Sequence, residues 1–184
     1  MEHISNHTYG LFVGRMQPIH DGHLAVIEEG LKRCETLIIA IGSAQEERTA
    51  RNPLTYLERA MLIRHVLDAE GIDPNRYIIV GVPDRENPSD DESWGEYLLN
   101  YIEDVVGGRP TIMLEGAEEV RSHWFSPEDN IDRYTMGREM KPVSATKIRE
   151  ALANGDNKYF YANAPKGIWF AIEFLTDIFR RTIR

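Results

Sequence analysis

The chain has 184 residues, 42% of them hydrophobic, which is enough apolar surface for one core, so we expect a single domain over residues 1–184. Its formal net charge of −9 argues against a nucleic-acid or membrane partner, because both need a basic protein face. The sequence has no apolar run of about 18 residues and no basic start followed by an apolar stretch, so we expect a cytoplasmic protein.

The first part of the chain predicts strands and helices in alternation. An apolar run at 8–13 (TYGLFV) predicts a strand, and apolar residues at helical spacing over 23–34 (HLAVIEEGLKRC) predict a helix with Cys34 on its apolar side. The continuous β-branched run at 36–41 (TLIIAI) predicts a strand that is covered on both faces, as in parallel sheets. A second helix is expected over 55–69.

The same alternation continues through the middle of the chain. A third strand is expected at 76–82 (RYIIVGV), followed by an acidic loop at 84–92. Aromatic and apolar residues between 94 and 105 mark one face of a third helix, and 110–115 (PTIMLE) predicts a fourth strand. Segment 116–141 has no clear period, and we expect a short helix and an irregular strand there.

Two helices are expected after this segment. SATKIREALANG is typical of a helix that begins at a capping serine, Ser144, and ends at a glycine. Pro165 is expected to open a last amphipathic helix. We therefore expect a core over 8–153 and a C-terminal helical segment over 157–184.

Strands that alternate with helices predict an α/β fold with a doubly wound parallel sheet. In such sheets, ligands bind beyond the carboxyl ends of the strands. The loops after Val13, Ile41, Val82 and Glu115 are therefore expected to surround one crevice.

The first of these loops, GRMQPIHDGH at 14–23, carries two histidines three positions apart. Gly14 permits a tight turn, and His23 falls in the first turn of the following helix, where unpaired N–H groups favour an anion. His20 and His23 with Arg15 form a donor set that suits phosphate oxygens. A zinc site would need at least one more ligand. From the spacing alone, phosphate chemistry, metal binding and an incidental pair of histidines all stay open.

The motifs together resemble a known family. GRMQPIHDGH resembles the HxGH signature of the nucleotidyltransferase superfamily, and KPVSATKIRE resembles its second signature. GRMQPIHDGHLAVIEEGL, LIIAIGSAQ and TARNPLTYLERAMLI are similar to the archaeal-type nicotinamide mononucleotide (NMN) adenylyltransferases. This resemblance implies a Rossmann-like nucleotidyltransferase fold that transfers AMP from ATP to NMN, with NAD and pyrophosphate as products.

The resemblance also implies roles for individual residues on the ATP side. The catalytic residues would be His20, His23 and Arg15. The ATP-binding residues would be Gly14, Arg51, Ser144, Thr146 and Arg149. On simpler interpretations, Ser144 would only cap its helix and Arg149 would lie on its surface. Mg²⁺ is expected to enter with ATP, and no metal-binding residue is implied.

The NMN-binding residues implied by the resemblance are Ser43, Asp84 and Trp94. Trp94 would stack on the pyridine ring, although its position on an apolar helical stripe also suits plain core packing. Ala145 replaces a glycine that is usual in the family, and LEGAEEVRSHWF follows the fourth strand where a serine-glycine-asparagine turn is common.

Other functions share these signatures. Nicotinate mononucleotide, phosphopantetheine or flavin mononucleotide could accept the nucleotidyl group, and CTP could replace ATP. A non-catalytic nucleotide-binding regulatory module is an alternative of another class, although such a module would not need the two histidines. The resemblance implies a homo-oligomer, since the family tends to form them, and the aromatic last helix has enough apolar residues to bury one face and leave another for such a contact.

Overall fold

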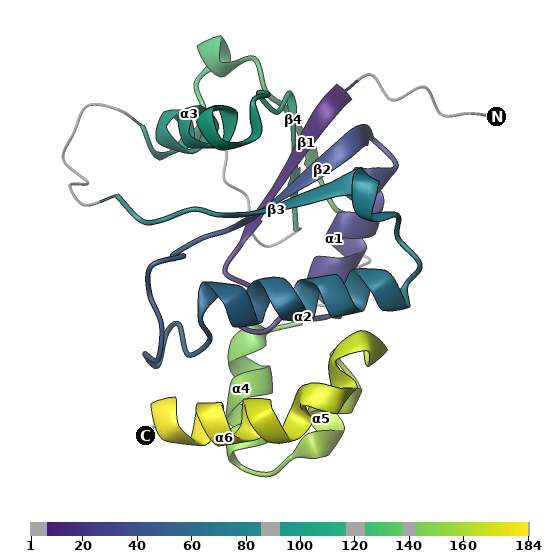
Figure 1. Ribbon diagram of the computed structural model, residues 1–184, viewed down its shortest axis with the longest axis vertical. Helices are drawn as coiled ribbons and strands as arrows, with labels where there is room; N and C mark the ends of the chain where they lie inside the picture. Colours follow the sequence, from purple (N-terminus) through teal and green to yellow (C-terminus); the bar gives the residue numbers. More distant parts are fainter. Residues whose placement is uncertain (1–6, 86–92, 117–123, 138–142, 184) are drawn as a thin grey trace.

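The computed structural model describes residues 7–85, 93–116, 124–137 and 143–183 of the chain. Five strands form one sheet in which every pair of neighbours is parallel, in the order β3-β2-β1-β4-β5 (Figure 1). The strands are β1 (His7–Gly14), β2 (Cys34–Ile41), β3 (Tyr77–Gly81), β4 (Ile112–Glu115) and β5 (Asp132–Thr135). The order confirms the predicted doubly wound sheet, because the chain moves outward from β1 in both directions.

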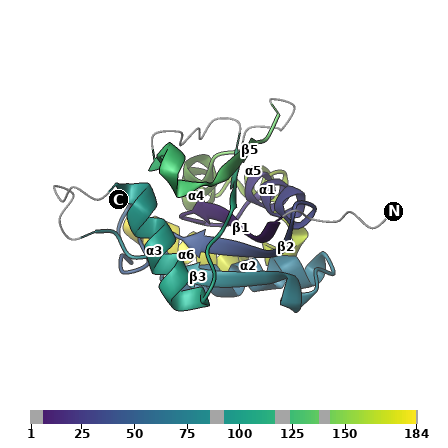
Figure 2. The same ribbon diagram turned by 90° about the horizontal axis from the view of Figure 1, so that it is seen from above.

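Helices cover both faces of this sheet. The α-helices are α1 (Asp21–Leu31), α2 (Tyr56–Ala69), α3 (Trp94–Val106), α4 (Ala145–Ala153), α5 (Asn157–Tyr161) and α6 (Ile172–Thr182). Short 3₁₀ helices join them, η1 (Pro74–Arg76), η3 (Pro127–Asp129) and η4 (Lys166–Ala171). Helix α3 lies on one face and α1 and α2 lie on the other (Figures 1 and 2). Helices α4, α5 and α6 gather beyond α2, where α4 packs against α6 and η4 packs against α2.

The central strand β2 shows why the sheet is buried on both sides. Leu37, Ile39 and Ile41 point into the core beneath α1 and α2, whereas Ile38 and Ala40 point into the smaller core beneath α3. Each fully buried aliphatic side chain of this kind stabilises the fold by roughly 1.5–3 kcal/mol. A run without polar alternation is therefore what a strand between two helical layers requires.

Helix α2 begins at a reciprocal cap next to the carboxyl end of β2. The Thr55 hydroxyl accepts from the Glu58 backbone N–H at 3.1 Å, and the Glu58 carboxylate accepts from the Thr55 N–H at 2.8 Å. Such a capping box satisfies two of the N–H groups that a helix start leaves unpaired. The helix predicted over 55–69 is confirmed, with Thr55 as its cap.

Several predicted elements differ in detail. The expectation of Cys34 on a helix is wrong: α1 ends at Leu31, the turn at 32–33 closes it, and Cys34 opens β2 as a buried residue. The last helix begins as the 3₁₀ turn η4 before α6, and the short α5 is a further helix at the start of the helical segment expected over 157–184. Within the segment without a clear period, η3 and β5 agree with the short helix and strand expected there. No helix among the described residues is both long and apolar enough to cross a membrane.

Candidate functional site

The candidate site lies where the sheet order reverses. Strand β1 has β2 on one side and β4 on the other, so the loops that follow these strands diverge from β1. A crevice beyond the carboxyl ends of the strands at such a switch point is the usual ligand site of an open α/β sheet. Gly14 ends β1, Ile41 ends β2 and Glu115 ends β4, so the loops expected around one crevice do begin at one edge of the sheet.

The two histidines of the first loop lie in contact at the start of α1. His20 is the N-cap of the helix, and its Nδ1 accepts a hydrogen bond from the His23 backbone N–H at 3.3 Å. The two imidazole rings are stacked, with centroids 3.6 Å apart and planes inclined by 17°. The rings therefore lie together at the positive end of the helix dipole.

The environment of His20 determines its protonation state. The side chain is only 7% exposed, and burial lowers the pKa of His20 to about 4. At neutral pH the ring is uncharged, because desolvation disfavours the imidazolium. Since Nδ1 accepts the bond from His23, the proton of the neutral ring belongs on Nε2. His20 is thus prepared to donate from Nε2.

Gly22 makes this ring arrangement possible. A Cβ atom at Gly22 would lie 3.2 Å from both Cε1 and Nδ1 of His20, closer than most side chains tolerate. The same Cβ would lie 3.8 Å from Cβ of Val143, in the segment that leads into α4. The glycine of the first motif therefore lies beneath the His20 ring and beside the approach to the second motif.

The second motif meets the first through a buried arginine. Arg149 on α4 donates from Nη1 to the main-chain oxygen of Gln17 at 2.8 Å and from Nη2 to Oγ1 of Thr146 at 3.2 Å. Arg149 is 7% exposed, so its interpretation as a surface residue is wrong. The structure brings together two motifs whose contacting residues lie 132 positions apart.

Ser144 caps the helix that carries this arginine. Its hydroxyl accepts from the Lys147 backbone N–H at 3.4 Å, so the capping role expected for this serine is confirmed. Ala145 opens the helix without difficulty in place of the usual glycine. Helix α4 thereby places an N-terminus, a hydroxyl and an arginine close together, all of them donors for an anion.

The charge of Arg15 acts on two other arginines near this point, Arg59 and Arg149. Burial lowers the pKa of Arg59 to about 10, and the nearby charge of Arg15 lowers it further. Burial, and then Arg15, also holds the pKa of Arg149 below its usual value. Arg15 thus disfavours the charge of two neighbouring cations, and a bound polyanion would offset this repulsion.

The loops after β2 and β3 meet at the same edge of the sheet. The Ser43 hydroxyl donates to Asp84 Oδ1 at 3.1 Å. Gln45 donates from Nε2 to Asp84 Oδ2 at 3.1 Å and accepts from the Asp84 backbone N–H at 3.0 Å. The structure thus brings Ser43 and Asp84 together, with Gln45 as their link.

Trp94 packs among other aromatic side chains. As the first residue of α3, it is half-buried and packs on Tyr97, with ring centroids 5.3 Å apart, and edge-on against Trp124 at 5.9 Å. Core packing accounts for this position, and the stacking role stays a prediction.

Arg51 is exposed and makes no hydrogen bond or ion pair within the parts of the chain that the structure describes, so it is not brought into contact with the other predicted residues. Of the acidic loop expected at 84–92, residues 86–92 lie outside the described residues.

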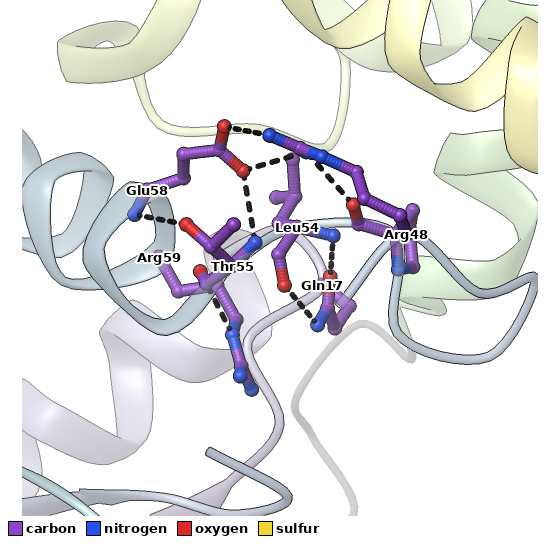
Figure 3. Close-up of polar contacts among 7 residues, drawn as sticks. Gln17, Arg48, Leu54, Thr55, Glu58 and Arg59 are labelled. Carbon is purple, nitrogen blue, oxygen red and sulfur yellow. Dashed lines mark hydrogen bonds and ion pairs between the residues drawn. The ribbon is translucent and has the colours of Figure 1, made fainter. Parts of the chain in front are cut away.

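Three residues of this region were missed by sequence reasoning. Gln17 bridges to Leu54, donating from Nε2 to its oxygen at 3.1 Å and accepting from its N–H at 2.9 Å (Figure 3). Gln45 holds Asp84, as described above, and Arg59 contacts the turns after β1 and β2. Arg59 could have been found from the sequence, because it occupies a core position of α2. It lies on the stripe that continues with the buried residues Leu62, Ile63 and Val66.

The donor set indicates the class of ligand. Neutral imidazole, guanidinium, hydroxyl and helix N-termini are donors to anionic oxygen, whereas a hard cation prefers carboxylate and carbonyl oxygens. Among the described residues, no three of His, Cys, Asp or Glu are grouped so as to hold a metal ion. The arrangement is suited to binding phosphate groups and to stabilising negative charge that develops on them.

Comparisons with known proteins agree with this geometry. Residues 11–151 match the cytidylyltransferase-like family. A nicotinamide-nucleotide adenylyltransferase of Ignicoccus hospitalis is 37% identical over 152 residues, covering 81% of this chain and 82% of that protein. Another, from Thermococcus onnurineus, is 43% identical over 147 residues, covering 80% and 73%.

Solved structures show the same fold. A bifunctional NMN adenylyltransferase/ADP ribose pyrophosphatase from Francisella tularensis, complexed with AMP and a manganese ion, superposes with a TM-score of 0.76 and 25% identity. The match covers 96% of this chain and 52% of that one, so this chain spans about half the length of the bifunctional protein.

Proposed function

The chain belongs to the cytidylyltransferase-like family and, within it, to the nicotinamide-nucleotide adenylyltransferases, and on this premise we propose that it transfers AMP from ATP to NMN, which gives NAD and pyrophosphate. The observation that carries the proposal is the contact of Arg149 with Gln17, because it joins the two phosphate-binding motifs of the family into one site. The resulting set of donors lies beyond the carboxyl ends of the strands, where a nucleotide is expected to bind.

The reaction needs no nucleophile from the protein. An oxygen of the NMN 5′-phosphate attacks the α-phosphorus of ATP in line, a new P–O bond forms, and the bond to the β-phosphate oxygen breaks as pyrophosphate leaves. Reactions of this kind depend mostly on positioning and charge stabilisation. The protein therefore has to hold two anionic substrates and to neutralise the charge that develops between them.

The first motif supplies donors for that charge. His20, neutral and with its proton on Nε2, would donate to an α-phosphate oxygen, and His23 beside it would do the same from the first turn of α1. Arg15 would contact the phosphates from the same turn, where Gly14 lets the backbone come close. The stacking of the two imidazoles supports joint action on one phosphate.

The second motif is suited to the leaving pyrophosphate. Ser144 and Thr146, together with the N–H groups of the α4 N-terminus, would bind the β- and γ-phosphates, and Arg149 would balance their charge. Arg51 is exposed, as are Arg15 and Thr146, and it would have to reach the triphosphate from the loop before α2.

The acceptor nucleotide would lie on the other side of the crevice. Ser43 and Asp84 are fixed against each other by their hydrogen bond and by Gln45, which supports a rigid acceptor pocket. Trp94 at the start of α3 would provide the ring face. Mg²⁺ would be coordinated by the ATP phosphates and by water, and it would neutralise part of the negative charge of the triphosphate.

The decisive experiment is an assay of purified protein for NAD and pyrophosphate with ATP, NMN and Mg²⁺. We expect one NAD per pyrophosphate, and we expect loss of product when EDTA removes the metal. Nicotinate mononucleotide, phosphopantetheine and flavin mononucleotide are tested in parallel, as is CTP with each acceptor. Faster turnover with one of these pairs would show that its acceptor or its nucleotide, and not NMN or ATP, is the substrate.

Absence of pyrophosphate with every pair would contradict an enzymatic role and would favour the nucleotide-binding module. The cytoplasmic location and the homo-oligomer stay predictions, and light scattering on the purified protein measures the second directly.

A further inference from the structure

Arg59 on α2 is a buried cation that donates to main-chain oxygens. Its Nη1 donates to the oxygens of Arg15 at 3.0 Å and Gly42 at 2.8 Å, and its Nη2 donates to the oxygen of Ser43 at 3.1 Å. Its Nε donates to the oxygen of Thr55 at 3.2 Å, which keeps the stem against its own helix (Figure 3). The side chain is fully buried, so water does not compete for these bonds.

Three of these acceptors belong to two strained turns. Met16, which follows the Arg15 carbonyl, has a φ of 51°, and Ser43, which follows the Gly42 carbonyl and itself supplies an acceptor, has a φ of 49°. Residues with a side chain rarely adopt this left-handed conformation, and it persists where surrounding contacts enforce it. The Arg59 guanidinium bonds to the main chain beside both of these residues.

These two turns serve opposite halves of the proposed reaction. The turn after β1 carries Arg15 and leads to the histidines on the ATP side. The turn after β2 carries Ser43, whose hydroxyl bonds to Asp84 on the acceptor side. The guanidinium adds a rigid link between the two turns to the contacts that they already share, which are the pairing of β1 with β2, the bond from the Gly42 N–H to the Gly14 carbonyl at 3.1 Å and the Gln17–Leu54 bridge.

A carboxylate does not account for this burial. All four acceptors that the structure gives Arg59 are main-chain carbonyl oxygens. A buried charge needs such partners, because desolvation disfavours it strongly. Several hydrogen bonds from a planar, permanently charged group are the property that distinguishes arginine from lysine.

We propose that Arg59 is a positioning residue of the adenylyl transfer, which holds the turn of the triphosphate site and the turn of the acceptor site in register through its guanidinium. The proposal rests on the proposed function, since it assigns the two turns to the two substrates. Arg59 itself does not contact the substrates. Its effect on the rate comes from alignment of the acceptor oxygen with the α-phosphorus, which a small displacement impairs.

The test compares Arg59→Lys and Arg59→Met with Arg76→Met as a matched control. Arg76 also donates to main-chain oxygens, those of Leu31, Cys34 and Glu35, but it lies at the opposite ends of the strands. Each variant is brought to a temperature at which urea titration shows it to be folded. The kcat and the KM for each substrate are then measured separately.

We expect both Arg59 variants to lose kcat/KM by about tenfold or more, with a rise in the KM for NMN as well as a fall in kcat. A purely structural role would lower the amount of active protein and would leave both KM values unchanged. For Arg76→Met we expect kcat and both KM values within about twofold of the original protein, even where its stability is lower.

Three results would overturn the inference. They are an Arg59→Lys protein with unchanged kcat and KM values, an equal loss in Arg76→Met, and failure of both Arg59 variants to fold, which would restrict Arg59 to folding. Absence of NAD synthesis by the unaltered protein would instead reject the proposed function. The two failures are therefore distinguishable.

Discussion

The two ring nitrogens of His20 differ in their bonding. Its Nδ1 caps α1 by accepting from the His23 N–H, and this bond leaves the proton on Nε2, the atom proposed to donate to the substrate. The sequence predicted a histidine just before the helix, because the glycine and the apolar period locate the helix start. The stacking of the rings could not be predicted, because it depends on the path of the chain over Gly22.

The lowered pKa of His20 predicts how stability depends on pH. In the unfolded chain the ring takes up a proton near the ordinary histidine pKa of 6.5, whereas the buried ring resists protonation until about 4. The unfolded state therefore binds more protons in this window, and stability falls as the pH is lowered through it. Between pH 7 and about pH 4.5 we expect a loss of roughly 2 kcal/mol from this residue.

Urea unfolding of His20→Asn provides the comparison, because asparagine can still cap the helix but does not titrate. The loss of stability on acidification should be smaller in this variant by about that amount. The lowered pKa values of Glu29 and Glu58 act on both proteins alike. Equal losses in the two proteins would show that His20 is not the group responsible.

His23 is expected to act on the transition state. Removal of one preorganised donor at a developing phosphate charge typically costs about 10²- to 10³-fold in kcat, so His23→Ala should fall in that range. The exposed His65 on α2 gives a control, and His65→Ala should stay within about twofold. Steady-state kinetics at saturating ATP and NMN measure both, and near-normal turnover of His23→Ala would reject its role.

Helix α4 connects the chemistry of the site to its architecture. It begins after the Ser144 cap, and its second turn places Arg149 against the Gln17 carbonyl. The helix itself was predictable from its serine cap, its apolar spacing and the following glycine. The burial of Arg149 was not, because it depends on a loop more than a hundred residues away in the sequence.

The position of Arg149 predicts a specific defect on removal. Arg149→Ala should raise the KM for ATP by about 10- to 100-fold, since hydrogen bonds to a charged group contribute roughly 1.5–3 kcal/mol. The KM for NMN should change much less. Lys147→Ala, an exposed residue of the same helix, should leave both values nearly unchanged. An unaltered KM for ATP in Arg149→Ala would remove this residue from the triphosphate site.

At the scale of the whole molecule, the sheet was the most predictable part. The apolar runs of β1 and β2 predicted buried parallel strands because they lack polar alternation, and the crossovers were long enough for helices. The short β5 was poorly marked, since its residues at 132–135 are mostly exposed and polar. The packing of α4 on α6 left no signal in either helix alone.

The site, like the fold, could be predicted only in part. The motifs marked the residues proposed to face a ligand, namely His20, His23, Ser43 and Arg149. The supporting residues Gln17, Gln45 and Arg59 bond mostly to main-chain atoms of distant loops, which can be any residue type and therefore leave no pairing pattern in one sequence. A charged residue on the buried stripe of α2 was the single available clue.

Cys34, the chain's only cysteine, has a practical consequence for spectroscopy. Its thiol is fully buried, donates to the Gly30 carbonyl at 3.2 Å, and has its pKa raised to about 11 by burial. Because the thiolate is the reactive form, only about one in a thousand is ionised at pH 8. A maleimide dye should therefore not label the unaltered protein. A cysteine introduced at Leu57, which is 74% exposed on α2, would take the label alone and would report fluorescence changes from the helix that carries Arg59.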